Sequence, residues 1–223
     1  MKLLSVLFPA VCPFCGAVIS EKEYKDYGFC YKCITGLDKF TELISEENNP
    51  NFPSCDRVYS AFKYYGVVKR TLIAYKFNEC PYLHKSFSVY MNRFLKKYNI
   101  FENVDIVTFV PISSKRFAGR GYNQAALIAQ ELVRLNNCYN KLKYLLDRKK
   151  NSDIRTSSLN LEQRKIDKFS FVDNKACLNG QRILLIDDIL TTGATIEECS
   201  KILKSHGASH VIAAVIASGR RDF

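Results

Sequence analysis

The densest group of residues with chemical potential lies between positions 183 and 195. A short apolar run, residues 183–186, predicts a buried strand, and the carboxylates of Asp187 and Asp188 follow it. A small, hydroxyl-rich turn comes next and consists of Thr191, Thr192, Gly193, Ala194 and Thr195. Backbone N–H groups, threonine hydroxyls and the N-terminus of a following helix all favour a phosphate dianion. We therefore expect this turn to bind a phosphate group.

The two carboxylates need a different role, because they would repel a phosphate beside them. Asp187 and Asp188 are suited to accept hydrogen bonds from the hydroxyl pair of a ribose, with or without Mg²⁺. An acidic cap followed by an ordinary capped helix is the simpler alternative, but it leaves the clustering of carboxylates and hydroxyls unexplained. The stretch resembles the motif of type I phosphoribosyltransferases that binds 5-phosphoribosyl 1-pyrophosphate (PRPP). This resemblance implies that the acidic pair belongs to the catalytic site and that residues 191–195 hold the 5′-phosphate.

A second group of polar residues follows the buried strand predicted over residues 104–110. Its first members are Ser113, Ser114, Lys115 and Arg116. Ligands of open α/β sheets bind at the carboxyl ends of strands, so we expect these residues to contact PRPP, with Lys115, Arg116 and Mg²⁺ on the pyrophosphate. Arg120 can bind phosphate through both guanidinium nitrogens. For Asn123, a functional role and an ordinary role as helix N-cap are equally good interpretations.

Four of the nine cysteines form two Cys-x-x-Cys pairs that are separated by fourteen residues. These residues are Cys12, Cys15, Cys30 and Cys33. Such pairs present four thiolates to one Zn²⁺, and a segment this small needs a metal because it cannot bury much apolar surface. Disulfides or a redox motif are the alternatives, although disulfides do not suit a cytoplasmic chain. With four cysteine ligands the metal site is closed, which predicts a structural role.

Composition allows one sizeable domain with a small appendage. The chain has 223 residues, 47% of them hydrophobic, and a net charge of +11. Residues 1–60 carry a charge of −2, and residues 61–223 carry +13. The excess of basic residues in 61–223 fits a polyphosphate ligand, a nucleic acid or both. A generally basic, solvated surface is the alternative. No run is apolar for long enough to span a bilayer, and residues 3–11 lack a signal-peptide cleavage site, so we expect a cytoplasmic protein.

Alternating strands and helices predict a mostly parallel sheet flanked by helices. We expect strands over 57–65, 104–110, 142–146, 182–187 and 210–217, and helices over 67–75, 81–98, 124–136 and 196–206. Residues 37–51 are interpreted as a helix end and a linker, which divides the chain into a zinc-binding segment with its linker (1–52) and a phosphoribosyltransferase-like domain (53–223). The basic connection 148–168 is either a mobile lid over the site or a solvated charged loop.

Over nearly its whole length the chain resembles the ComF family, phosphoribosyltransferase-like proteins linked to competence and DNA uptake. The resemblance rests on the cysteine pairs, the acidic motif and a further set: Tyr64, Gly66, Lys76, Val110, Pro111 and the run Arg120-Gly121-Tyr122-Asn123-Gln124. In the lid, Ser158, Leu159 and Arg164 match the family. Asp153, Thr156 and Asp167 depart from it. The resemblance implies a type I phosphoribosyltransferase fold with a zinc-ribbon-like N-terminus.

Three functions are compatible with these features. The first is a PRPP-binding cytoplasmic protein that handles incoming single-stranded DNA during natural transformation, together with a competence helicase and DNA-processing proteins. In that case Tyr64, Tyr65 and Tyr122 are candidates for stacking on bases, although they are equally good core residues. The second is an active transferase that moves the phosphoribosyl group to a base or an amine. The third is a zinc-dependent scaffold without catalysis.

Overall fold

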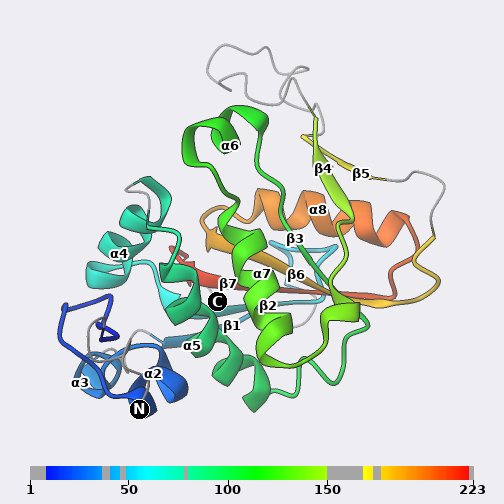
Figure 1. Ribbon diagram of the computed structural model, residues 1–223. Helices are drawn as coiled ribbons and strands as arrows, with labels where there is room; N and C mark the ends of the chain where they lie inside the picture. Colours follow the sequence, from blue (N-terminus) through cyan, green and yellow to red (C-terminus); the bar gives the residue numbers. More distant parts are fainter. Residues whose placement is uncertain are drawn as a thin grey trace.

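The computed structural model describes residues 9–36, 41–45, 49–77, 80–149, 168–172 and 177–220. A five-stranded sheet with the order β1-β2-β7-β6-β3 runs through its centre (Figure 1). These strands are β1 (Thr41–Ile44), β2 (Arg57–Lys63), β3 (Ile106–Phe109), β6 (Arg182–Leu190) and β7 (His210–Ser218). Strands β2, β7, β6 and β3 are parallel, and β1 pairs antiparallel with β2. The predicted α/β class with a mostly parallel sheet is confirmed.

Helices cover both faces of this sheet. One face packs against α4 (Gly66–Phe77), α5 (Leu83–Lys97) and α7 (Gln124–Leu135), and the other against α8 (Ala194–Ser205). The shorter elements are α2 (Glu21–Tyr27), α3 (Tyr31–Gly36), α6 (Ser114–Arg120), a 3-10 helix (Tyr139–Lys141) and a hairpin of β4 (Leu146–Arg148) and β5 (Phe169–Phe171). Figure 1 shows α6 and this hairpin projecting beyond the sheet on the same side.

The apolar residues of β6 serve two cores because successive side chains of a strand point to opposite faces. Leu184 and Ile186 pack with the cluster under α4, α5 and α7, whereas Ile183 and Leu185 pack with the cluster under α8. All four side chains are fully buried. A continuous apolar run is therefore what a central parallel strand with helices on both faces requires.

The cysteine-containing segment packs onto the first of these cores. Phe14 stacks on Phe29 with ring centroids 4.2 Å apart, and Phe29 makes edge contacts with Phe62 and Phe87 of the main sheet and helices. Helix α2 begins at a capping box and ends at Gly28, whose φ of 73° suits glycine. A Cβ there would lie 2.3 Å from the Ser86 carbonyl oxygen, so this segment contacts α5 closely.

Several element boundaries differ from the sequence-based expectations. Residues 41–44 form strand β1, where a helix end and a linker were expected, because they pair with the free edge of β2. The strand expected over 142–146 starts only at Leu146, and Leu142 forms an isolated bridge to Val107. The lid residues 153–167 lie outside the described residues. Within the described part of the chain, no helix has the length and apolar character needed to cross a bilayer.

Candidate functional site

Six of the predicted site residues meet at the carboxyl ends of β3 and β6: Arg116, Arg120, Asp187, Asp188, Thr191 and Thr195. A cavity of about 340 Å³ lies there. Its polar lining consists of Tyr64, Lys76, Arg116, Arg120, Arg148, Asp187, Asp188, Thr191 and Thr195. These residues come from five separate stretches of chain, which the sheet and its helices bring together. The position agrees with the rule that ligands of open α/β sheets bind at the carboxyl ends of the strands.

The acidic pair lies within β6, where the sequence suggested that the strand ends. Pairing with β7 continues past it, since Asp187 is opposite Val215 and Ile189 is opposite Ala217. The Oδ1 atom of Asp187 accepts a hydrogen bond from the backbone N–H of Asp188 at 2.8 Å. Both carboxylates are therefore mounted on a rigid central strand rather than on a loop.

Lys76 is a site residue whose contact the sequence did not predict. Its Nζ lies 2.9 Å from Oδ2 of Asp188, and the two side chains are only 20% and 14% exposed. Burial and the adjacent charge of Asp188 raise the pKa of Asp187 to about 7, against the opposing effects of Lys76 and Arg116. The cavity thus holds two unequal carboxylates, one paired with an ammonium group and one that is costly to ionise.

This raised pKa makes the stability of the protein depend on pH. Between about pH 4 and about pH 7 the folded protein binds the extra proton, so the free energy of unfolding falls as pH rises through this range. We expect Asp187→Asn, which keeps the Oδ1 acceptor, to raise the free energy of unfolding by about 1–2 kcal/mol above pH 7. Urea unfolding at pH 4 and pH 8 measures the effect. An equal gain at both pH values contradicts this prediction.

The turn between β6 and α8 has the conformation of an anion cradle. Gly193 adopts φ 88° and precedes a helix whose N-terminus has no side-chain cap. The hydroxyl of Thr192 accepts the N–H of Ala194 at 3.4 Å, and the hydroxyls of Thr191 and Thr195 belong to residues that line the cavity. Thr192, Gly193 and Ala194 shape the turn without being part of the cavity lining.

Residues distant in sequence hold this turn in place. Arg220 donates from Nη1 to the carbonyl of Thr192 at 2.8 Å, and its guanidinium lies 5.2 Å from the centre of the Phe52 ring. On the other side, the Glu197 carboxylate accepts the N–H and the hydroxyl of Ser54 at 2.9 and 2.6 Å. No local sequence motif predicts these contacts, because they join residues that are 28 and 143 positions apart.

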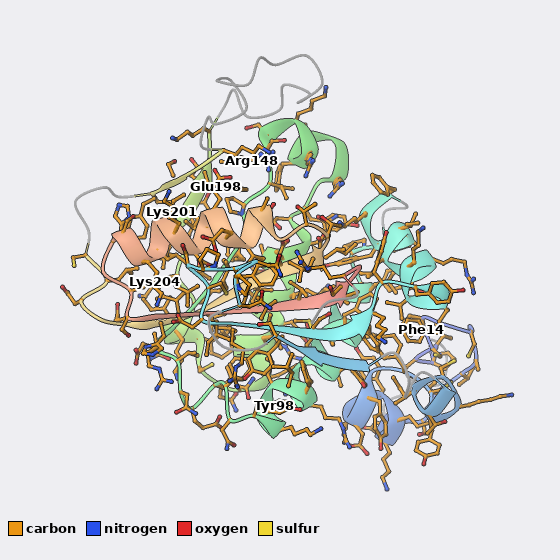
Figure 2. The ribbon with its side chains drawn as sticks, turned by 180° about the vertical axis from the view of Figure 1, so that it is seen from behind. Phe14, Tyr98, Arg148, Glu198, Lys201 and Lys204 are labelled. Atoms are coloured by element: carbon orange, nitrogen blue, oxygen red, sulfur yellow. The ribbon has the colours of Figure 1, made fainter. Side chains whose placement is uncertain are left out.

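A similar support brings Arg148 to the cavity. Glu198 accepts backbone N–H groups from Lys168 and Phe169, the second at 3.0 Å. Arg148 pairs with Phe169 across the hairpin, and its guanidinium lies 5.3 Å from the centre of that ring. Figure 2 labels Arg148 of the hairpin and Glu198 of α8. Helix α8 thereby positions both the turn of residues 191–195 and a cationic side chain of the hairpin.

The second predicted group is divided between several roles. Residues 114–120 form helix α6, and Ser113 caps it by accepting the N–H of Arg116 at 3.3 Å. Arg116 and Arg120 line the main cavity, whereas Ser114 lines a neighbouring one. Lys115 is exposed and lines neither of these two cavities.

The motif around Asn123 braces the walls of the cavity. Asn123 caps α7 by accepting two backbone N–H groups, and its Nδ2 donates to the carbonyl of Val110 at 3.0 Å. The hydroxyl of Tyr122 donates to the carbonyl of Tyr75, and the hydroxyl of Tyr75 donates to the carbonyl of Gln124 at 3.0 Å. The capping role of Asn123 is confirmed, and the brace fixes the end of α4, which carries Lys76.

The four predicted cysteines lie together at the other end of the molecule. Their sulfur atoms are all within 4.8 Å of one another, and Cys15 Sγ is 3.7 Å from Cys30 Sγ. Four thiolates bound to Zn²⁺ at about 2.3 Å would be about 3.8 Å apart, so the set could hold a metal. Burial raises the pKa of Cys30 and Cys33, which means that a bound cation is needed to keep these thiols ionised.

Residues 97–222 match the family model described as the phosphoribosyl transferase domain. Because this match covers more than half of the chain, the chain belongs to that family. It is 32% identical over 150 residues to the competence protein ComFC of Streptococcus pneumoniae. The matched residues make up 67% of this chain and 63% of that protein. The competence protein F of Haemophilus influenzae is 24% identical over 204 residues, covering 86% and 85% of the two chains.

A third relative, the competence protein ComFC of Bacillus subtilis, is 25% identical over 198 residues, which make up 88% of this chain and 72% of that protein. Together these relatives confirm the ComF-family resemblance. The matched region is less than two thirds of the length of the pneumococcal protein.

Proposed function

We propose that this chain binds PRPP and acts in natural competence, in the cytoplasm, by handling incoming single-stranded DNA. One observation carries the proposal: the acidic pair shares one cavity with Arg116, Arg120 and Thr195, and Thr195 belongs to the first turn of α8, whose N-terminus has no side-chain cap. An acidic pair suits ribose hydroxyls, and the helix terminus and arginines suit phosphates. The competence relatives support the biological role.

The proposed binding mode assigns each part of the ligand to a group of residues. Asp187 and Asp188 accept hydrogen bonds from the ribose hydroxyls. The turn of residues 191–195 holds the 5′-phosphate, and Arg116 and Arg120 hold the pyrophosphate. Mg²⁺ prefers oxygen ligands and neutralises pyrophosphate charge, and the carboxylates in the cavity suit it. When PRPP is bound, the ammonium of Lys76 is released from Asp188 to contact a ligand oxygen.

Single-stranded DNA is the proposed polyanionic partner. Residues 61–223 carry a net charge of +13, and large aromatic side chains stand out on the α4 side of the cavity. Tyr65, just before α4, and Phe77, at its end, are 69% and 66% exposed, and Lys69 and Arg70 of α4 are also exposed. Exposed rings interleaved with cations provide stacking and phosphate contacts without sequence preference.

We propose in addition that the four-cysteine cluster binds a structural Zn²⁺.

An active transferase is the second candidate, and the cationic end of the cavity favours it. In that reaction the bond between C1 of the ribose and the pyrophosphate oxygen breaks, and a base or amine nitrogen forms the new bond to C1. Arg116 and Arg120 would stabilise the charge that develops on the leaving pyrophosphate. Release of pyrophosphate on addition of an acceptor separates this candidate from simple binding.

Calorimetric titration with PRPP and Mg²⁺ tests the proposed function. We expect PRPP to bind saturably to the wild type. The affinity of the double variant Asp187→Asn, Asp188→Asn should be weaker by at least about 100-fold. The double variant Glu21→Gln, Glu102→Gln is the control, because it changes the same charge at exposed positions outside the cavity. A folded wild type that does not bind PRPP overturns the proposal and favours a scaffold.

A further inference from the structure

A second polar cavity lies at the opposite edge of the sheet, where the parallel strands begin. Its volume is about 460 Å³. Three basic residues near the starts of neighbouring strands line it: Arg57 of β2, Arg182 of β6 and His210 of β7. Tyr98 and Asn103, from the connection between α5 and β3, complete its polar wall. None of these residues takes part in the site at the carboxyl ends.

The topology of the sheet explains why these basic residues converge. Strands β2, β7 and β6 are adjacent and parallel, so their amino ends meet at one edge. Arg182 is directly opposite His210, and Arg57 is opposite Ile212 on the same strand β7. Three residues far apart in the sequence are thus placed within one or two residue steps of one another.

Basic residues outnumber acidic residues in the lining of this cavity. Asp56 is the acidic residue among the described residues that line it, and its Oδ2 lies 2.8 Å from Nζ of Lys204 and accepts the N–H of Val211 at 2.6 Å. This carboxylate is therefore already balanced by a lysine, and it does not offset the charge of Arg182. Figure 2 shows Lys204 on α8 and Tyr98 on the other side of the sheet.

Arg182 also has an unused donor. Its Nε is buried and has no acceptor within the part of the chain that the structure describes. A buried donor without an acceptor costs about 1–3 kcal/mol, so such groups normally find a partner in the native state. The fork of a guanidinium group matches the oxygens of a phosphoryl group, which would satisfy this donor.

We propose that this cavity binds a small phosphorylated metabolite of nucleotide size. Arg57 and Arg182 hold its phosphoryl group, and the half-buried ring of Tyr98 packs against its organic part, beside Ile100 and Ile212. The volume is within the range of small-molecule sites and larger than a phosphate ion needs. Asp187 follows Arg182 by five residue steps along β6, or about 17 Å, so this ligand does not compete for the acidic pair.

Titration with AMP, followed by NMR of the arginine Nε–H groups, tests this proposal. The experiment uses the full chain with Asp187→Asn and Asp188→Asn, so that it does not depend on PRPP binding. We expect the Nε–H resonance of Arg182 to shift saturably with AMP, at an affinity about tenfold higher than for inorganic phosphate. Equal affinities for AMP and phosphate would show that the cavity takes a simple anion and would overturn the proposal.

Variants separate a built site from general basic attraction. Arg182→Lys keeps the charge but loses the guanidinium fork, and we expect it to weaken AMP binding about tenfold. Lys201→Gln is the matched control, because Lys201 is exposed on α8 and lines neither of the two cavities (Figure 2). If Arg182→Lys has no effect, or if Lys201→Gln weakens binding as much, the site does not exist. Failure of PRPP binding in the wild type leaves this result unaffected.

Discussion

Replacing Gly193 with alanine is expected to lower the free energy of unfolding by about 2–4 kcal/mol and to weaken PRPP binding. Two costs add together at this position. The φ of 88° is one that residues with a Cβ rarely adopt, and the new Cβ would lie 2.1 Å from Cε1 of Phe52. Because Phe52 is buried, relief of this clash requires either the ring or the turn of residues 191–195 to move. Urea unfolding measures the stability, and calorimetry with PRPP measures the binding.

Gly180→Ala is the control for this change. Gly180 has a similar φ of 77°, but a Cβ there would meet nothing within 4 Å. It should therefore show only the conformational cost, about 1 kcal/mol. Adding Phe52→Leu to Gly193→Ala should restore part of the lost free energy of unfolding, since the shorter side chain leaves room for the new Cβ. Equal destabilisation by the two glycine substitutions would mean that the contact with Phe52 does not shape the turn.

Replacing Cys12 with serine is expected to remove the proposed metal and to destabilise the chain by at least about 3 kcal/mol. Serine cannot supply the fourth thiolate, and the remaining three sulfur atoms leave the site open. The destabilisation extends beyond the cysteine-containing segment because Cys12 is buried and packs in the same cluster as Phe29 and Phe62. The zinc-to-protein ratio measured by mass spectrometry should fall from about one to near zero. Thermal unfolding should shift to lower temperature at the same time.

An exposed cysteine outside the cluster provides the comparison. Cys177→Ser removes one thiol but none of the four that lie together. It should keep the full metal content and nearly the wild-type melting temperature. A Cys12→Ser protein with an unchanged zinc-to-protein ratio would exclude these cysteines as the metal site.

The parts that the sequence predicted best are those with local, repeated patterns. The buried run 183–186 identified the central strand, because only a strand covered on both faces is apolar at every position. The spacing of the cysteines predicted their meeting, because two tight turns suffice to bring each pair together. The position of the acidic pair beside a turn and a helix was also predictable, since all three are consecutive in the chain.

Contacts between distant segments could not be predicted in this way. Strand β1 was interpreted as linker because four residues at a sheet edge carry little periodic signal, and their pairing with β2 is what orders them. Continued pairing with β7 overrides the tendency of Asp187 and Asp188 to end a strand. The ion pair of Lys76 with Asp188 depends on where α4 ends over the sheet, which only the packed fold determines.

The shared aromatic core has a consequence for how this protein can be divided. Phe14 and Phe29 cover Phe62 and Phe87, and β1 covers the outer edge of β2. A fragment that begins at residue 53 would present these rings and an unpaired strand edge to solvent, which is the usual starting point for self-association. Truncation as a test of the proposed PRPP site would therefore report mainly on solubility, whereas point substitutions at the acidic pair leave the interface between the segments in place.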